Sequence, residues 1–250
     1  MNALILAAGY ATRLYPLTLT KAKPLLEVAG KPMIEWVIDS IAPIPDLETV
    51  YIVTNNKFAA DFRNWADDYS SRNPKVVFKI INDGSTSDDD KKGAIGDIHL
   101  SIQREHLYSK DLMVVAGDNL FSESVEGFAV AGKDAAATVA VYDVGDLELV
   151  KKYNSITLDA SGRVTKFVEK SPEPVDTFSA IALYYYRKDT LPFIDQYIAE
   201  GNNPDQPGRL IEWLYKRTEV KTWPVPGLWF DIGGKESLVE AGEVFAQFAK

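Results

Sequence analysis

The sequence predicts an α/β fold, in which helices cover both faces of a mixed and mostly parallel β-sheet. Short runs of Val, Ile and Leu, bounded by Gly, Asn or Asp, are typical of buried strands. In about the first 140 residues these runs alternate with segments whose apolar residues recur at helical spacing. This alternation favours parallel pairing, because each helix carries the chain back across the sheet.

The expected elements can be placed in chain order. Apolar runs predict the strands Ala3–Ala8, Val50–Thr54, Val76–Ile81, Leu112–Ala116 and Ala136–Tyr142. Helical stripes run through Ile34, Val37, Ile38 and Ile41, through Ile95, Ile98 and Ile102, and through Leu238, Ala241, Phe245 and Phe248. After about residue 140, Ser155–Leu158, Val164–Glu169 and Phe178–Tyr186 predict strands joined by turns.

The chain shows no boundary between domains. It has no Ser/Gly-rich linker, no internal repeat and no low-complexity tract. We therefore expect one domain over residues 1–250, with a first half (1–140) and a second half (141–250) that completes the sheet and closes a pocket.

Composition excludes several classes of function. The 250 residues contain no cysteine, which removes disulfides, thiolate nucleophiles and cysteine-ligated metal sites. With 27 basic and 36 acidic residues the net charge is −9, so we expect no nucleic-acid partner. A local basic pocket for a small phosphorylated ligand remains compatible with this charge.

The N-terminal segment does not resemble a targeting signal. Its apolar run covers only Ala3–Ala8 and follows no basic residue, unlike a secretory signal peptide. No stretch approaches about 18 consecutive apolar residues, so we expect no membrane span. The expectation is a soluble, cytoplasmic protein.

The loop after the first strand, Leu6–Leu14, carries the chemistry expected of a polyphosphate site. In a parallel sheet, ligands bind where strands end, and small residues such as Gly9 let backbone N–H groups approach a ligand closely. Thr12 adds a hydroxyl and Arg13 a planar guanidinium, while Lys23 supplies a second cation. The loop alone is also compatible with an ordinary turn that carries a surface arginine.

Two common nucleotide motifs are absent. The P-loop pattern does not occur, and the dinucleotide pattern G-x-G-x-x-G fails because positions 11 and 14 are Ala and Leu. The second strand is followed by Asn55 and Asn56, without the acidic residue that holds a ribose. These departures disfavour a dinucleotide-dependent oxidoreductase.

The segments Leu6–Leu14, Lys23–Leu26 and Lys31–Ile34 closely resemble the sugar-1-phosphate nucleotidyltransferases, which are nucleoside-diphosphate-sugar pyrophosphorylases. Glucose-1-phosphate thymidylyltransferase is the nearest well-known type. That family shows L-A-x-G-x-G-T-R-L followed by K-P-L, and this chain departs from it at Ala11. The resemblance covers residues 3 to about 242. It implies a Rossmann-like fold of the glycosyltransferase-A type, without the β-helix domain that some relatives append at the C-terminus.

The resemblance also implies which residues bind the nucleotide. It assigns nucleotide binding to the first half of the chain and sugar binding to the second. Arg13 would steady the leaving phosphates, and Lys23 would offset charge at the α-phosphate. The nucleotide-binding positions carried over are Leu6, Ala7, Ala8, Gly9, Thr12, Arg13, Lys23, Asn82 and Gly93.

Two aspartates correspond to the family's metal ligands. Asp118 follows a buried strand and a glycine, and Asp231 lies in a Trp-Phe-Asp-Ile-Gly segment. Mg²⁺ prefers oxygen ligands and is commonly held by one or two carboxylates together with phosphates. The resemblance therefore implies Mg²⁺ as the cofactor, although a turn or a helix cap also explains such aspartates.

The sugar-phosphate positions that the resemblance implies are Asn119, Asn154, Glu169 and Lys170. Glu169 would contact sugar hydroxyls, and Lys170 would hold the sugar phosphate. Ser171 interrupts the family's E-K-P pattern, and Asn154 replaces a usual glycine. We interpret the acidic run Asp88–Asp90 as a solvated, mobile flap, with a lid over the triphosphate as the alternative.

The expected reaction joins a nucleoside triphosphate to a sugar 1-phosphate and releases pyrophosphate. Overall likeness favours dTTP or UTP and glucose 1-phosphate. Relatives often form dimers or tetramers, so a homo-oligomer is also expected. Two alternatives remain open: a cytidylyltransferase acting on phosphocholine or another phosphorylated alcohol, and a noncatalytic relative that binds sugar nucleotides.

Overall fold

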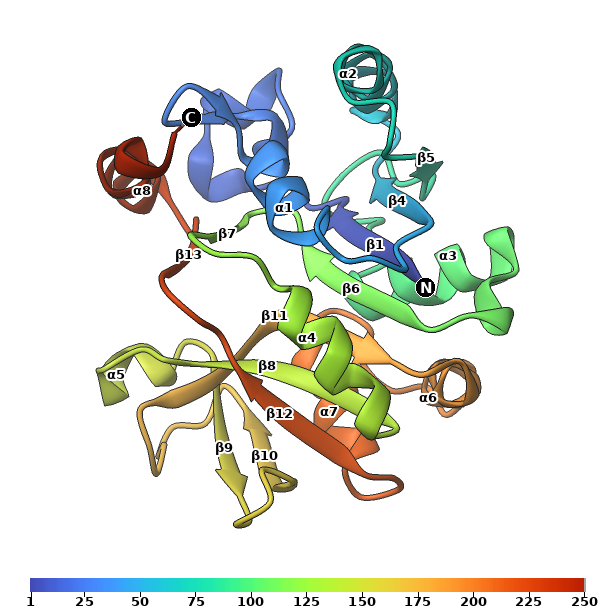
Figure 1. Ribbon diagram of the computed structural model, residues 1–250, viewed down its shortest axis with the longest axis vertical. Helices are drawn as coiled ribbons and strands as arrows, with labels where there is room; N and C mark the ends of the chain where they lie inside the picture. The colour runs from blue at the N-terminus through green and yellow to red at the C-terminus, as the bar shows by residue number, and fades with distance from the viewer. Residues whose placement is uncertain (250) are drawn as a thin grey trace. The chain divides into compact units, whose positions relative to one another are not determined.

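The computed structural model describes residues 1–249 and divides the chain into two compact units. Unit 1 contains Met1–Lys92, Val115–Glu126 and the segment from Pro226 onward. Unit 2 contains Gly93–Val114 and Gly127–Val225. Each unit is therefore built from segments that are far apart in the sequence (Figure 1).

Seven strands form the main sheet, which is mixed and mostly parallel as the sequence predicts. They are β1, β4, β5, β6, β8, β11 and β12. In unit 1, β1 pairs in parallel with β4, and β4 in parallel with β5. In unit 2, β12 pairs in parallel with β8, whereas β11 pairs with β8 in antiparallel orientation.

The elements of unit 1 are β1 (Asn2–Ala7), β2 (Glu27–Val28), β3 (Lys31–Pro32), α1 (Met33–Ile41), β4 (Thr49–Thr54), α2 (Ala59–Arg72), β5 (Phe78–Asn82), β7 (Asn119–Phe121), β13 (Trp229–Asp231) and α8 (Lys235–Phe245). Single 3₁₀ turns cover Thr12–Leu14, Leu17–Leu19, Lys23–Leu25 and Ala246–Phe248.

The elements of unit 2 are α3 (Ala94–Glu105), β8 (Ala137–Asp143), α5 (Leu147–Val150), β9 (Asn154–Leu158), β10 (Val164–Glu169), β11 (Phe178–Tyr186), α6 (Pro192–Ala199), α7 (Gly208–Leu214) and β12 (Val220–Pro224). Strand β6 (Leu112–Ala116) and helix α4 (Glu126–Ala131) run across the unit boundaries, and 3₁₀ turns cover Leu107–Ser109, Gly132–Asp134 and Lys188–Thr190.

Most of the predicted strands agree with the structure to within one residue, but the third begins later than expected. The sequence predicts a strand from Val76, whereas β5 begins at Phe78. Val76 instead closes a turn by donating its backbone N–H to Asn73 O, and Val77 is 53% exposed. Val76 and Val77 therefore precede the strand and are not part of it.

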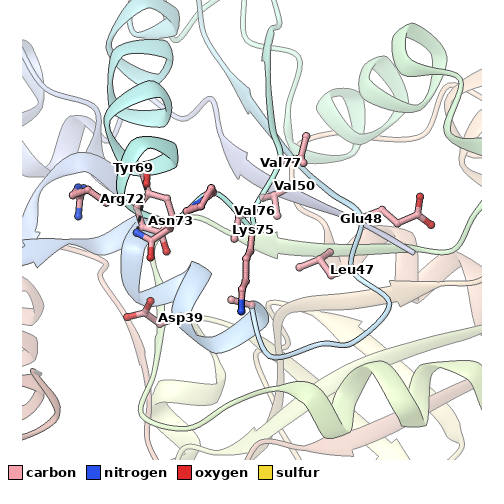
Figure 2. Close-up of a pocket in the computed structure, with 12 residues that line it drawn as sticks. Asp39, Leu47, Glu48, Val50, Tyr69, Arg72, Asn73, Lys75, Val76 and Val77 are labelled. Carbon is pink, nitrogen blue, oxygen red and sulfur yellow. Dashed lines mark hydrogen bonds between the residues drawn. The ribbon is translucent and has the colours of Figure 1, made fainter.

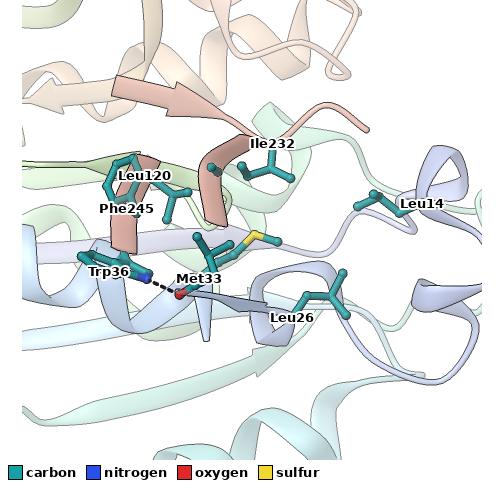
Figure 3. Close-up of a cluster of buried hydrophobic side chains, with 9 residues drawn as sticks. Leu14, Leu26, Met33, Trp36, Leu120, Ile232 and Phe245 are labelled. Carbon is teal, nitrogen blue, oxygen red and sulfur yellow. Dashed lines mark hydrogen bonds between the residues drawn. The ribbon is translucent and has the colours of Figure 1, made fainter. Parts of the chain in front are cut away.

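The C-terminal helix joins the first loop and α1 in one apolar cluster of unit 1 (Figure 3). Trp36 of α1 and Phe245 of α8 make an edge-to-face ring contact at 5.1 Å. Leu120 of β7 and Ile232, just after β13, are both fully buried in the same cluster. This packing attaches β7 and β13 to the segment that holds Leu14, and so fixes the polar residues beside them.

In unit 2, the three consecutive tyrosines of β11 pack on alternate faces of the sheet. Tyr184 and Tyr186 lie on one face with their rings stacked at 6.2 Å. Tyr185 contacts Phe128 on α4 and closely approaches Gly132, where a Cβ atom would overlap its ring. All three side chains are buried, so they stabilise the sheet.

Candidate active site

The first loop begins where β1 ends and follows a backbone path that suits glycine. Ala11, which replaces the family's glycine, has φ +48°, in the left-handed region. Its carbonyl accepts hydrogen bonds from Leu14 N at 2.9 Å and Thr18 Oγ1 at 2.9 Å. A Cβ atom at Gly9 would meet no other atom within 4 Å, so the space over this loop is open. Alanine at position 11 therefore adopts a left-handed backbone conformation that favours glycine.

Asp118 comes close to the first loop because Gly117 packs directly against the end of β1. Gly117 N donates to Leu6 O at 2.9 Å, and a Cβ atom at Gly117 would lie 3.1 Å from the same oxygen. Only glycine fits this approach without moving the backbone. Close packing against β1 therefore explains the glycine that precedes Asp118. The same packing places Asp118 near the carboxyl end of β1.

Lys23 and Asp118 form a short, largely buried ion pair. Lys23 Nζ lies 2.5 Å from Asp118 Oδ2, and their side chains are 12% and 24% exposed. Burial acts to raise the pKa of Asp118, but the charge and hydrogen bond of Lys23 and the Asn119 amide outweigh it, so the pKa is lowered. Asp118 is therefore held as a carboxylate.

Asp231 lies beside Asp118 because β13 pairs with β7. In this antiparallel pair Asp231 is opposite Asn119, and Ile232 N donates to Asp118 O at 3.4 Å. Burial and the neighbouring charge of Asp118 raise the pKa of Asp231 to about 6, against the opposing effects of Lys23 and Arg13. The structure therefore brings together two residues that are 113 positions apart.

Arg13 approaches the same pair from the first loop. Its Nη1 atom lies 3.9 Å from the position that a Cβ atom would take at Gly233. The helix that follows Asp231 begins at Lys235, and its cap is Gly234, whose backbone N donates to Ser237 Oγ at 3.0 Å. Asp231 is thus free of the capping role that the sequence left open for it.

Asn82, a predicted nucleotide-binding residue, is hydrogen-bonded to its neighbours. Asn82 Nδ2 donates to Asn56 Oδ1 at 2.8 Å, and Asn82 Oδ1 accepts from Gly84 N at 2.9 Å. The acidic run beyond it is exposed, but Asp90 accepts hydrogen bonds from Thr86 N and Ser87 N. These bonds lower the pKa of Asp90 to about 2. The loop therefore has a hydrogen-bonded turn of its own.

Gly93 opens α3 in unit 2 and is confined by backbone. It has φ +78°, and a Cβ atom there would lie 2.6 Å from Pro204 O. The next two residues donate their backbone N–H groups to Asp205 O and Pro204 O. The positive φ and the close backbone of Pro204 therefore explain the glycine at position 93 without any contact to a nucleotide.

Glu169 ends β10 in unit 2 with a buried carboxyl oxygen. Among residues 1–249, its Oε2 has no hydrogen-bond partner. Burial raises the pKa of Glu169 to about 7; Lys170 and Arg209 oppose this and Glu212 reinforces it. A polar atom in this state is available to hydrogen-bond a ligand.

Asn154 supports the strand pair that carries Glu169. It lies opposite Glu169 in the β9–β10 register and is 5% exposed. Its Nδ2 donates to Ala180 O and its Oδ1 accepts from Ala180 N, both at 2.8 Å. The side chain therefore ties this hairpin to β11. Lys170, exposed and with φ +52°, follows directly and donates its backbone N–H to Tyr153 O.

Sequence reasoning assigned no role to Trp229 or Gly208. Trp229 donates its indole N–H to Asn119 Oδ1 at 2.7 Å. Gly208, at the start of α7, faces Glu169, and a Cβ atom there would overlap Glu169 Oε2. The Trp-Phe-Asp motif could have pointed to Trp229, whereas no local pattern marks Gly208.

Two neighbouring aspartates, Asp118 and Asp231, could bind a metal in this site. No group of three or more His, Cys, Asp or Glu side chains suited to a metal occurs within residues 1–249. Two neighbouring, partly buried carboxylates nevertheless suit Mg²⁺, whose remaining ligands are commonly phosphate and water oxygens. The residues of unit 1 therefore fit a cation that binds together with a nucleotide.

A cavity of about 470 Å³ lies elsewhere in unit 1, at the amino ends of β4 and β5 (Figure 2). Its lining includes Asp39, Tyr69, Arg72 and Lys75, and none of the predicted site residues. Ligands of parallel sheets bind at the carboxyl ends of strands, so this cavity is not a candidate active site.

None of the helices within residues 1–249 has the length and hydropathy needed to traverse a lipid bilayer.

Comparison with known proteins relates the chain to enzymes of one kind. It is 29% identical over 237 residues to a Sulfolobus acidocaldarius protein named, provisionally, as a mannose-1-phosphate guanyltransferase, covering 93% of this chain and 60% of the relative. It is 25% identical to the bifunctional protein GlmU of Methanocaldococcus jannaschii, with 97% and 54% covered. The chain thus spans little more than half the length of these relatives.

A third relative is closer in length. The glucose-1-phosphate thymidylyltransferase of Neisseria meningitidis is 26% identical, with 96% of this chain and 81% of the relative covered. The crystal structure of a UDP-glucose pyrophosphorylase bound to UDP-glucose superposes with a TM-score of 0.82 at 21% identity, covering 99% of each chain, and so shares the fold. The family model described as nucleotidyl transferase matches residues 2–247, and the chain belongs to that family.

Proposed function

We propose that the protein transfers a nucleotidyl group from a nucleoside triphosphate to a sugar 1-phosphate, releasing pyrophosphate. The observation that carries this proposal is the arrangement of Lys23, Asp118 and Asp231 in unit 1, with Arg13 at its margin. Two cations and two partly buried carboxylates at the carboxyl ends of parallel strands suit a triphosphate bound with Mg²⁺.

In the proposed reaction, a phosphate oxygen of the sugar 1-phosphate attacks the α-phosphorus in line with the pyrophosphate leaving group. The new bond joins this oxygen to the α-phosphorus, and the α–β phosphoanhydride bond breaks. The nucleophile is already an anion at neutral pH, so no general base is needed. Catalysis then consists of positioning and charge neutralisation.

Each cation of unit 1 has a separate task in this scheme. Lys23 offsets the charge at the α-phosphate, and Arg13, which is exposed, steadies the departing phosphates. The open space over Gly9 leaves the backbone at this residue accessible to a phosphate oxygen. Asp118 and Asp231 hold Mg²⁺, which supplies electrophilic stabilisation of phosphate charge when bound.

Unit 2 supplies the residues proposed for the sugar 1-phosphate. The buried Oε2 of Glu169, which lacks a hydrogen-bond partner within residues 1–249, suits a sugar hydroxyl donor, and the exposed ammonium of Lys170 suits the phosphate. Asn154 holds the hairpin in place through Ala180. Asn119 lies in unit 1 and contacts Asp118, so we assign it to the metal site.

We propose dTTP or UTP as the nucleotide and glucose 1-phosphate as the acceptor. The thymidylyltransferase relative, of which this chain covers 81%, supports that choice. The relative named as a guanyltransferase makes GTP with mannose 1-phosphate the pair to test against it.

The test is pyrophosphate release with Mg²⁺, using dTTP, UTP, CTP, GTP and ATP in turn with glucose, mannose, galactose and glucosamine 1-phosphates. The proposal predicts release that needs both substrates and stops on addition of EDTA. Absence of release with every pair, from folded protein that nucleotides do stabilise thermally, would contradict the sugar 1-phosphate assignment.

A further inference from the structure

Asn119 is buried between an indole and a carboxylate in unit 1. Its side chain accepts a hydrogen bond from Trp229 Nε1 at 2.7 Å through Oδ1, and donates to Asp118 Oδ1 at 3.2 Å through Nδ2. Asn119 is 2% exposed and Trp229 8% exposed. The three groups therefore form a continuous chain of hydrogen bonds that ends on a proposed metal ligand.

The direction of this chain is set by Trp229. An indole N–H is only a donor, whereas an asparagine amide has one accepting and one donating end. The indole therefore requires Asn119 Oδ1 to face it, which turns the amide N–H₂ toward Asp118. Without the indole donor, Asn119 Oδ1 would lose this partner, and the amide that donates to Asp118 would be held by one hydrogen bond fewer.

The two oxygens of Asp118 receive different donors. Oδ1 accepts from Asn119, and Oδ2 accepts from Lys23 Nζ at 2.5 Å. A carboxylate held at both oxygens has a fixed plane, so the lone pairs that remain for a cation point in a fixed direction. The neighbouring β7–β13 pair places Trp229 and Asp231 on the same strand, so one element carries both the anchor of the chain and the second carboxylate.

We infer that Trp229 is a positioning residue that acts through Asn119 to fix the Asp118 carboxylate for a divalent cation bound with the nucleotide. This inference rests on the proposed function, because it assigns the cation to Asp118. It predicts that loss of the indole N–H weakens cation binding even where the packing of the ring is kept. Groups that orient metal ligands typically change metal affinity by about 10- to 100-fold when removed.

The test is Mn²⁺ binding in the presence of nonhydrolysable nucleotide, measured from the electron paramagnetic resonance of free Mn²⁺, without turnover. Trp229→Phe keeps an aromatic ring and removes the donor, so we expect Mn²⁺ affinity to fall by about 10-fold or more. Nucleotide affinity in EDTA should stay unchanged.

The matched control is Trp36→Phe. Trp36 lies in the same unit, is 4% exposed, and donates its indole N–H to Val28 O at 2.9 Å. It therefore loses an equivalent hydrogen bond and a similar amount of buried ring, but it has no link to Asp118. We expect a comparable loss of thermal stability in both variants and normal Mn²⁺ affinity in Trp36→Phe.

A second variant keeps the inference testable if Trp229→Phe does not fold. Asn119→Ala removes the amide and should lower Mn²⁺ affinity to a similar degree. Where both single variants fold, the double variant should bind Mn²⁺ no more weakly than Asn119→Ala, because Trp229 acts through the amide. Additive losses would overturn the inference.

The outcomes separate this inference from the proposed function. Normal Mn²⁺ affinity in Trp229→Phe, or in Asn119→Ala, contradicts the positioning role and leaves the nucleotidyl transfer intact. If the wild-type protein with nucleotide binds no Mn²⁺, both the metal site and the positioning role are contradicted.

Discussion

Asp118 of unit 1 and Glu169 of unit 2 respond to burial in opposite ways. In unit 1, Asp118 is contacted directly by Lys23 and Asn119, and these partners lower its pKa despite burial. In unit 2, Glu169 has Lys170 and Arg209 in its surroundings, but its Oε2 has no hydrogen-bond partner within residues 1–249, and burial raises its pKa to about 7. Direct contact with a cation therefore decides which effect prevails.

The difference matches two kinds of ligand. A carboxylate that stays charged suits a metal cation, whereas one that titrates near neutral pH can accept or donate a hydrogen bond. A sugar hydroxyl can do either in return. The contrast supports assigning the metal to Asp118 and sugar hydroxyls to Glu169.

The largest effect is expected from neutralising the charged carboxylate. Asp118→Asn should lower turnover by about 10³-fold or more, because it removes a proposed metal ligand and leaves Lys23 without its counter-charge. The measurement is the rate of pyrophosphate release at saturating substrates. Asp39→Asn is the control, because Asp39 pairs with Lys31 on the exposed surface of the same unit and should change turnover little. Retention of a tenth or more of the wild-type rate in Asp118→Asn would break the contrast.

A moderate effect is expected when the titrating carboxyl is replaced. Glu169→Gln should raise the KM for the sugar 1-phosphate by about 10-fold and leave that for the nucleotide unchanged, since one hydrogen bond to a hydroxyl is altered. Steady-state kinetics with each substrate varied in turn measure this. Equal changes in both KM values would show that Glu169 does not act on the sugar alone.

The same variant should change how stability depends on pH. The pKa of Glu169 rises from 4.5 to about 7 on folding, so the native state holds this proton more tightly than the unfolded state does. Its contribution therefore falls as pH rises from about 4.5 to 7, by about 3 kcal/mol in total, and is constant above that range. Urea unfolding from pH 4.5 to 8 should show a flatter profile for Glu169→Gln than for wild type. Parallel profiles would contradict the raised pKa.

The smallest effect is expected from moving Glu169 without replacing it. A Cβ atom at Gly208 would overlap Glu169 Oε2, so Gly208→Ala should displace the carboxyl and raise the KM for the sugar 1-phosphate by about 3-fold. Gly242→Ala is the control, because that helical glycine of α8 has open space around its Cβ position and should gain stability of about 0.5–1 kcal/mol. Unchanged sugar KM in Gly208→Ala would show that the carboxyl has room to adapt.

The sequence predicts the fold better than it predicts the arrangement within each unit. Buried strands such as β1 and β6 are apolar on both faces, so their composition alone marks them. Helix α2 is less evident, because its apolar stripe of Phe62, Ala66 and Tyr69 is diluted by charged residues. The return of the last segment to unit 1 depends on the packing of Phe245 against Trp36, which no local pattern encodes.

The part of the candidate site that lies within short sequence motifs could be predicted. The motifs identify Arg13, Lys23 and Asp118, and the structure places them with Asp231 in one unit. The amides of Asn82 and Asn154 are bonded within the protein, which sequence cannot reveal because it carries no hydrogen-bond geometry. Trp229 and Gly208 matter only through the groups they contact, and those contacts arise from tertiary structure.

The most direct test of the proposed function follows each phosphate of the nucleotide. With sugar 1-phosphate and Mg²⁺, nucleoside triphosphate carrying ³²P at the α position should label a sugar nucleotide, and ³²P at the γ position should appear only in pyrophosphate. Appearance of the γ label in orthophosphate or on the sugar would contradict nucleotidyl transfer, because it would mean that the β–γ bond and not the α–β bond is broken.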